Sequence, residues 1–430
     1  MQQLRRVLLL ALALFFPLLA HALSLEEGLK IITERGRDVK IAQSDEDAAR
    51  AAVGLARSPW LPWVDLYGRE TWLHYQPEAK TPFGAFPTSQ GQFTTYGVRA
   101  TQLLYDFGKT SSSINAAHYG LEAREIETRR ARNQSALDFI IAYLDLLESE
   151  KLLQVAQDEV NRYEAHEKDT SARFRAGVIT KNEVLQADVL LSDSQQRFLT
   201  TENLRSVRAS KLNSLLLRPL SDTVQVEEIK TNPASGITLE EAWAISEAES
   251  FDLRDIDARI AAKEQSVQST RAEYLPTLYA SGGYEYLENR YLVHQDNWSV
   301  IAGVNINLLA GGASASKIGI AKSELRSLTL TREKMLDNIR LAVKAAHLDL
   351  QSSSRKMDVT KTAVAQAEEN LRLQRLRYRE GVGTATDVLD AVTLMTTAES
   401  NSWKALYGVK RAEAMLLYFM GKDLTNIYGK

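Results

Sequence analysis

Few side chains in this sequence have the type and spacing that catalysis or metal binding requires. The six histidines are scattered along the 430 residues, and no two of them form a pair with metal-ligand spacing. His74 and His294 fall in predicted hairpins, where a loop or interfacial role is simpler than a ligand role. The sequence contains neither a glycine-rich phosphate loop nor a nucleophile motif. We therefore expect no enzymatic activity, no cofactor and no metal site.

The carboxylates near the C-terminus are better candidates for function. Asp387 and Asp390 are three positions apart and share one face of a predicted helix. Thr384-x-x-Asp387 and Thr180-x-x-Glu183 both have the spacing of a capping box at a helix start. Capping alone would account for Asp387 and Glu183. It does not account for Asp390, which is therefore the stronger functional candidate.

An internal repeat determines which elements position these motifs. Ser24-Leu25-Glu26-Glu27 recurs as Thr238-Leu239-Glu240-Glu241, a shift of 214 positions (238 minus 24). Further along, the shift becomes 204, which relates Gly177 to Gly381 (381 minus 177). The change of ten falls between Pro62 and Gly108, so we expect the first hairpin to contain the additional residues.

Each repeat has the same predicted internal order: a first helix, a β-hairpin, a very long helix and a returning helix. We assign residues 23–219 to the first repeat, 220–237 to a linker rich in helix breakers, and 238–430 to the second repeat. The first helices are expected at Leu25–Arg57 and Leu239–Arg271.

Four segments have the pattern of β-strands. They are Pro62–Tyr75, Gln92–Leu104, Pro276–Glu288 and Trp298–Leu308. In the last segment, apolar side chains alternate with mainly small or polar ones, as in a transmembrane strand with one face toward lipid. Aromatic residues near the strand ends suit lipid interfaces. A half-buried sheet in a soluble protein is the alternative interpretation.

The segments after the hairpins predict unusually long helices. Leu121–Ala176 and Ile320–Glu380 contain neither glycine nor proline. Continuous helices of about 65 residues would reach roughly 100 Å at 1.5 Å per residue. Val184, Ala187 and Leu191 on the first returning helix suit antiparallel coiled-coil packing. Gly177 and Gly381 are expected to end the long helices in the left-handed conformation.

The N-terminus has the pattern of an export signal. Arg5 and Arg6 precede an apolar run, Val7–Leu19, which is followed by Ala20-His21-Ala22. We predict a signal peptide over residues 1–22, cleaved after Ala22, because the run is too short for a membrane anchor. Loss of the two arginines would change the formal net charge from −3 to −5, which gives no reason to expect nucleic-acid binding. The absence of cysteine excludes disulfides and an N-terminal lipid anchor on cysteine.

Four strands are too few to close a barrel within one chain. An open sheet in hydrocarbon would expose unpaired backbone groups at its edges, at several kcal/mol each. If these strands enter a membrane, several chains must therefore share one barrel. The alternative from a different class is a periplasmic coiled-coil scaffold or adaptor without a membrane span.

With these motifs in their doubled order, the sequence resembles the TolC family of outer-membrane efflux and secretion channels. The resemblance rests on the Leu-Pro entries at 61–62 and 275–276, the strand exits at 103–108 and 308–312, the turns at 173–178 and 377–382, and Asp-Val-Leu-Asp-Ala at 387–391. It implies an α+β membrane protein whose homotrimer forms a 12-stranded β-barrel on a long α-helical barrel. Such a protein is the passive exit duct of a tripartite efflux or type I secretion system. It would work with a periplasmic adaptor (membrane fusion) protein and an inner-membrane transporter. The missing cysteine suggests the unlipidated type.

The resemblance also implies roles for individual residues. The periplasmic tips that touch the adaptor would be Gly177, Val178, Ile179, Gly381, Val382 and Gly383. The periplasmic aperture would be lined by Asp390, Asp387, Tyr378 and Glu183, with threefold symmetry turning each carboxylate into a ring that favours cations. Some members have arginine where this chain has Gly383, so this chain lacks the side chain that would form a salt-bridge latch at that position. The choice among drugs, metal ions and secreted proteins as cargo stays open.

Overall fold

A computed structural model describes residues 23–229 and 236–429. The predicted signal peptide and part of the predicted linker therefore lie outside the described residues. The chain forms two compact units. The helical unit contains residues up to Ile41, Arg129–Phe251 and the chain from Leu336 onward, and the sheet unit contains Ala42–Thr128 and Asp252–Met335.

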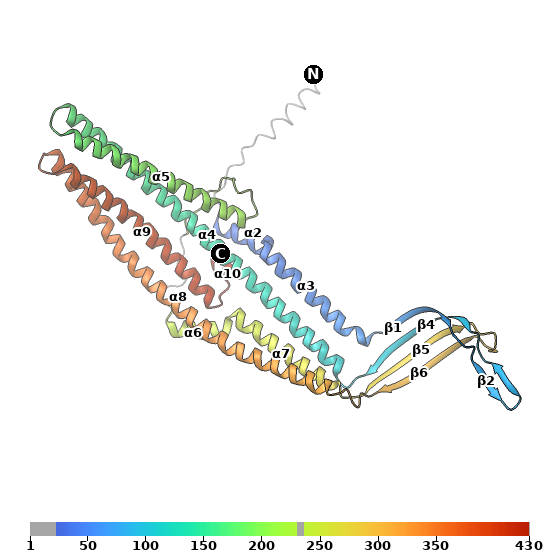
Figure 1. Cartoon of the computed structure of the whole chain (residues 1–430). Coiled ribbons are helices and arrows are strands. Elements are labelled where there is room, and N and C mark those ends of the chain that lie inside the picture. The colour runs from blue at the N-terminus through green and yellow to red at the C-terminus, as the bar shows by residue number, and fades with distance from the viewer. Residues whose placement is uncertain (1–22, 230–235, 430) are drawn as a thin grey trace, which may run out of the picture. The chain divides into compact units, whose positions relative to one another are not determined.

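The sheet unit contains one antiparallel sheet in the order β1-β4-β5-β6 (Figure 1). Its strands are β1 (Trp63–Trp72), β4 (Gln92–Tyr105), β5 (Thr277–Leu287) and β6 (Asp296–Asn305). All four predicted strands are thereby confirmed, with one correction. The strand expected to reach Leu308 ends at Asn305, because its partner Thr277 is already the first residue of β5.

A small additional hairpin accounts for the length difference between the repeats. It consists of β2 (Glu78–Thr81) and β3 (Gly84–Pro87) and lies in the connection between β1 and β4. The structure describes no corresponding strands in the connection between β5 and β6. The additional residues therefore lie inside the first hairpin, as predicted.

The strand register separates an apolar face from a polar face. One row across the sheet pairs Leu66 with Val98, Val98 with Tyr284, and Tyr284 with Trp298. The adjacent row on the other face joins Tyr67, Gly97, Glu285 and Asn297. The Tyr67 hydroxyl donates to Glu285 at 2.7 Å. A Cβ at Gly97 would lie 2.9 Å from the Tyr67 hydroxyl oxygen, so glycine allows the ring to lie flat across the sheet.

Each predicted first helix is broken once, which corrects the single helices expected there. The first repeat has α2 (Leu25–Arg35) and α3 (Arg37–Arg57), and the second has α6 (Leu239–Glu249) and α7 (Phe251–Ala272). Gly36 is extended (φ −53°, ψ 139°), and its N–H donates to the Ile32 carbonyl at 2.9 Å to close α2. The Gly36 carbonyl then accepts the Lys40 N–H at 3.0 Å and starts α3. Ser250 breaks the second repeat in the same way, with ψ 125°.

The long helices are continuous, as predicted. α4 (Lys109–Arg175) and α8 (Ala313–Arg379) each contain 67 residues. They are followed by α5 (Lys181–Leu215) and α9 (Ala385–Phe419), each of 35 residues, and the chain ends with α10 (Leu424–Tyr428). In the helical unit, α4 pairs with α5, and α8 pairs with α9 (Figure 1). No helix in the described ranges has the length and apolar character needed to cross a membrane.

The main core of the helical unit forms around one apolar face of α4. Phe139, Ile140 and Tyr143 are fully buried and pack with residues of α2, α5 and α9. The Tyr143 hydroxyl lies 2.7 Å from the Glu227 carbonyl oxygen and accepts the Glu227 N–H at 2.8 Å. This contact fixes the linker against α4 at Glu227.

Candidate functional site

The two helix turns that the sequence identified as tips have the same backbone geometry. Gly177 and Gly381 have φ of +72° and +75°, in the left-handed region. The Val178 N–H donates to the Arg173 carbonyl, and the Val382 N–H donates to the Arg377 carbonyl, both at 3.0 Å. This is the hydrogen-bond pattern of a Schellman motif. The prediction of left-handed glycine caps is confirmed.

The residues predicted to contact an adaptor differ in solvent exposure. Gly177, Val178, Gly381 and Val382 are exposed, whereas Ile179 is half-buried. Gly383 is also half-buried, and its N–H donates to the Arg377 carbonyl at 3.1 Å. A Cβ at Gly383 would lie 3.1 Å from the Tyr378 nitrogen, so a larger side chain would require a local shift.

The predicted capping boxes are present at the start of α5 and α9. The Thr384 N–H donates to the Asp387 carboxylate at 3.0 Å, and the Asp387 N–H donates to the Thr384 hydroxyl at 3.2 Å. The bonds from Thr384 lower the pKa of Asp387. Glu183 accepts the Thr180 N–H at 3.5 Å. Asp390 is exposed and makes no hydrogen bond or ion pair with the residues that the structure describes.

Tyr378, another predicted aperture residue, is buried beneath side chains of α4. The Arg173 guanidinium lies 4.7 Å from the centre of the Tyr378 ring, and the His166 ring lies 5.6 Å away. Arg173 also donates to the carbonyls of Tyr378 and Arg379 at 3.3 Å and 3.5 Å. The Asp169 carboxylate forms an ion pair with the Arg173 guanidinium, with Nε and Oδ2 3.1 Å apart. A cation at these last carbonyls of α8 is favoured by the helix dipole.

Sequence reasoning missed Arg173 and His166 as partners of Tyr378. The available signal was weak, because Arg173 belongs to the recognised turn motif but nothing in the sequence says which helix it contacts. His166 is buried, and its Nε2 has no hydrogen-bond partner among the described residues. Burial lowers the pKa of His166, against the opposing effect of Asp169. The neutral imidazole is therefore the form that packs against Tyr378.

Farther from the tips, polar contacts join α4 to α9. Arg162 donates two hydrogen bonds to Glu399, both at 2.8 Å. The Tyr163 and Thr393 hydroxyls are 3.0 Å apart. Both contacts connect the first repeat to the second within the helical unit.

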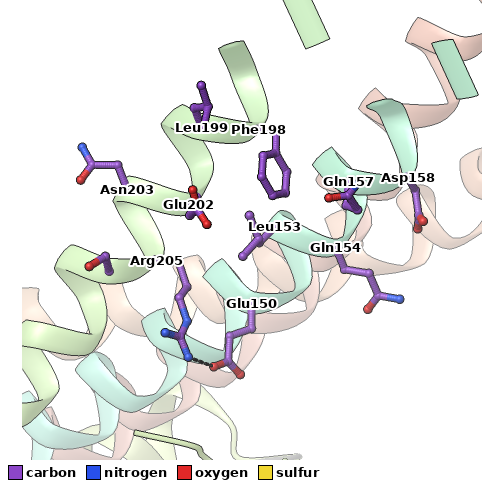
Figure 2. A pocket seen from close by; sticks show the side chains of 11 residues that line it. Glu150, Leu153, Gln154, Gln157, Asp158, Phe198, Leu199, Glu202, Asn203 and Arg205 are labelled. Carbon is purple, nitrogen blue, oxygen red and sulfur yellow. Dashed lines mark hydrogen bonds and ion pairs between the residues drawn. The ribbon is translucent and has the colours of Figure 1, made fainter. Parts of the chain in front are cut away.

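Hollows in the helical unit lie between its helices. A groove of about 970 Å³ lies between α4 and α5, and Arg205 donates to Glu150 there at 3.0 Å. Phe198 and Leu153 face one another in this groove (Figure 2). A smaller cavity of about 360 Å³ is lined by residues of α4, α8 and α9, including His166, Arg375 and Val388. Within the described ranges, no three histidine, aspartate or glutamate side chains are grouped so that they could hold a metal ion.

Comparison with known proteins gives a consistent answer. The family model described as "Outer membrane efflux protein" matches residues 29–216 and 245–422. The outer membrane protein TolC of Salmonella enteritidis is 21% identical over 419 residues, which cover 93% of this chain and 83% of that protein. The alkaline protease secretion protein AprF of Pseudomonas aeruginosa is 22% identical, and the match covers 94% of this chain and 85% of AprF.

The fold is also that of solved channels. The outer membrane protein VceC from Vibrio cholerae superposes with a TM-score of 0.80 at 17% identity, covering 93% of this chain and 96% of VceC. The alternative of a periplasmic scaffold is therefore wrong. The chain belongs to the outer membrane efflux protein family and is a TolC-type efflux or secretion channel, not an enzyme.

Proposed function

We propose that this chain is the unlipidated subunit of a homotrimeric exit duct that crosses the periplasm and the outer membrane. It would serve a tripartite efflux or type I secretion system as a passive channel. The observation that carries the proposal is a four-stranded sheet with a continuous apolar face and two unpaired edges, β1 and β6, in the described chain.

The apolar face of the sheet is suited to lipid. Leu66 on β1 and Trp298 and Val300 on β6 are strongly exposed, with Val300 at 90%. In water such a surface is unfavourable, whereas in hydrocarbon it is matched by its surroundings. The edges are the remaining difficulty, because each unpaired backbone group in lipid costs several kcal/mol. Pairing β6 of one chain with β1 of the next removes these edges, and three chains give a barrel of twelve strands.

Exposed apolar stripes on α5 and α8 support the same assembly. Val189, Leu199 and Val207 are exposed on α5 at spacings that place them on one side of the helix. Leu341, Leu348 and Val359 form a similar exposed stripe on α8. Burial of these stripes between neighbouring chains would produce a closed helical tunnel.

The tips and the aperture complete the proposal. Gly177, Val178, Ile179, Gly381, Val382 and Gly383 would contact the periplasmic adaptor, which in turn would bind an inner-membrane transporter. Asp390 would contribute one carboxylate to a ring of three, together with Asp387, Glu183 and Tyr378 nearby. The export signal over residues 1–22 would be removed after Ala22.

Single-channel recording tests this proposal. The full chain, extracted from outer membranes and added to a planar bilayer, is expected to produce discrete conductance steps that divalent cations block. Asp390→Asn should weaken the block, whereas Gln186→Asn, at the equivalent position of the first repeat, should leave it unchanged. Recovery of the protein only in the soluble periplasmic extract, or a complete lack of conductance, would argue against a channel. An unchanged block in Asp390→Asn would remove Asp390 from the aperture.

A further inference from the structure

Equivalent residues of the two repeats differ sharply in exposure near the tips. The shift of 204 relates Phe174 to Tyr378 (378 minus 174) and Leu185 to Leu389 (389 minus 185). Phe174 is 41% exposed whereas Tyr378 is 5% exposed, and Leu185 is 52% exposed whereas Leu389 is 3% exposed. The repeats have similar sequences here, so the difference comes from what covers each position.

The covering element of the second repeat is α4 of the first repeat. Arg173 and His166 of α4 lie over Tyr378, and Tyr163 of α4 packs in one cluster with Leu389. The equivalent side of the first repeat has no such cover in a single chain. By the repeat symmetry, its cover would be the helix equivalent to α4, which is α8.

Within its own chain, α8 packs through Leu371 against Tyr163 of α4 and Leu389 of α9. The missing cover over Phe174 and Leu185 must therefore come from a second copy. We propose that α8 of one chain covers Phe174 and Leu185 of the next, and that Arg377 is the key contact. Arg377 is equivalent to Arg173 (377 minus 173 is 204). It would stack on Phe174 of the neighbouring chain and donate to the carbonyls of Phe174 and Arg175. In its own chain the Arg377 guanidinium donates to Gln374 at 3.3 Å and has no ion pair with a described residue.

The equivalent residues also make the contact between chains less polar than the contact within a chain. Arg162 and Glu399, which form the ion pair between α4 and α9, correspond to Gln366 and Gln195. Asp169, which holds Arg173, corresponds to Leu373. The contact between chains therefore lacks the carboxylates that hold the two repeats together within one chain. The tips of the tunnel would separate first between chains.

Cysteine cross-linking can test this arrangement, which rests on the oligomer proposed above. The chain has no cysteine, so introduced residues would be its only thiols. The test pair is Arg377→Cys with Arg175→Cys. The matched control is its equivalent within one chain, Arg173→Cys with Arg379→Cys. Both pairs would be treated in outer membranes with a short bismaleimide and separated on a denaturing gel.

The test pair is expected to give linked species up to three chains in mass, whereas the control pair stays at the mass of one chain. A test pair that remains at one chain, while native mass measurement still shows an oligomer, would overturn the inference and leave the proposed function intact. A ladder from both pairs would also contradict it. A native mass of one chain would instead refute the proposed assembly itself.

Discussion

Arg173 combines three interactions at the end of α8. Its guanidinium stacks on Tyr378, donates to two carbonyls of the last helical turn, and binds Asp169. A planar guanidinium can do this, whereas a lysine ammonium would lose the stacking and the forked donor geometry. The glycine two residues beyond the helix then reverses the chain.

Substitution of the tip glycines should have a local and measurable cost. Gly177→Ala places a Cβ in the left-handed region, which costs about 1 kcal/mol. We expect hydrogen exchange in the last turn of α4 to become roughly fivefold faster, since about 1 kcal/mol corresponds to that factor. Gly120→Ala is the matched control, because Gly120 lies inside α4 with open space around it. There alanine should slow local exchange. Equal effects of both substitutions would contradict this account.

His166 should make the tip region sensitive to acid. Its pKa is lowered by burial, so the folded protein keeps it neutral while an unfolded chain takes up a proton below about pH 6.5. Stability that is present above this pH is therefore lost as the pH falls. Asp169 of α4 and Glu183 of α5 oppose the effect, whereas Arg173 of α4 and Arg375 of α8 reinforce it.

The test compares melting temperatures at pH 7.5 and pH 5. His166→Gln should lose less stability between these values than the unmodified protein. His294→Gln, in an exposed loop, should behave like the unmodified protein. An identical pH dependence in all three proteins would show that His166 makes no contribution.

Among the elements, α4 and α9 are joined by a half-buried ion pair between Arg162 and Glu399. Its double-mutant cycle with glutamine at both positions should give a coupling energy of about 1 kcal/mol. The exposed pair Arg372–Glu369 within α8 should give a value near zero, because solvent screens it. Chemical denaturation of the four variants of each pair measures both energies. If the coupling energy of Arg162–Glu399 is no larger than that of Arg372–Glu369, the Arg162–Glu399 ion pair does not stabilise the contact between the repeats.

The two faces of β6 should respond in opposite ways to charge. Val300→Arg places a guanidinium on the apolar face, where a membrane-spanning strand would lose about 2–4 kcal/mol. Ser299→Arg places the same group on the polar face and should be tolerated. The yield of detergent-extracted oligomer from outer membranes measures the difference. Equal yields from both variants would contradict the assignment of the apolar face to lipid.

Periodicity and capping residues predicted most elements, whereas breaks and contacts between elements escaped prediction. Most of the length of α4 and α8 follows from the glycine- and proline-free runs Leu121–Ala176 and Ile320–Glu380, and the turns follow from Gly177 and Gly381. The break at Gly36 was missed because a single glycine is compatible with a helix. The β2–β3 hairpin was missed because its four-residue strands lack a clear alternation. The burial of Tyr378 depends on long-range packing by α4, which local sequence does not encode.

For the whole molecule, the duplication explains why one chain is incomplete. Two similar hairpins of helices cover each other only on one side, and Phe174 and Leu185 remain exposed on the other. Two similar β-hairpins likewise leave β1 and β6 as edges. In the proposed trimer, further copies around an axis would cover the exposed helix positions and pair both sheet edges.

The mass of the particle extracted from the outer membrane tests this central claim most directly. Light scattering in detergent, corrected for bound detergent, gives the protein mass alone. We predict three times the mass of the processed chain, because three chains supply the twelve strands that leave no edge unpaired. A stable membrane-extracted particle with the mass of one chain would contradict the account.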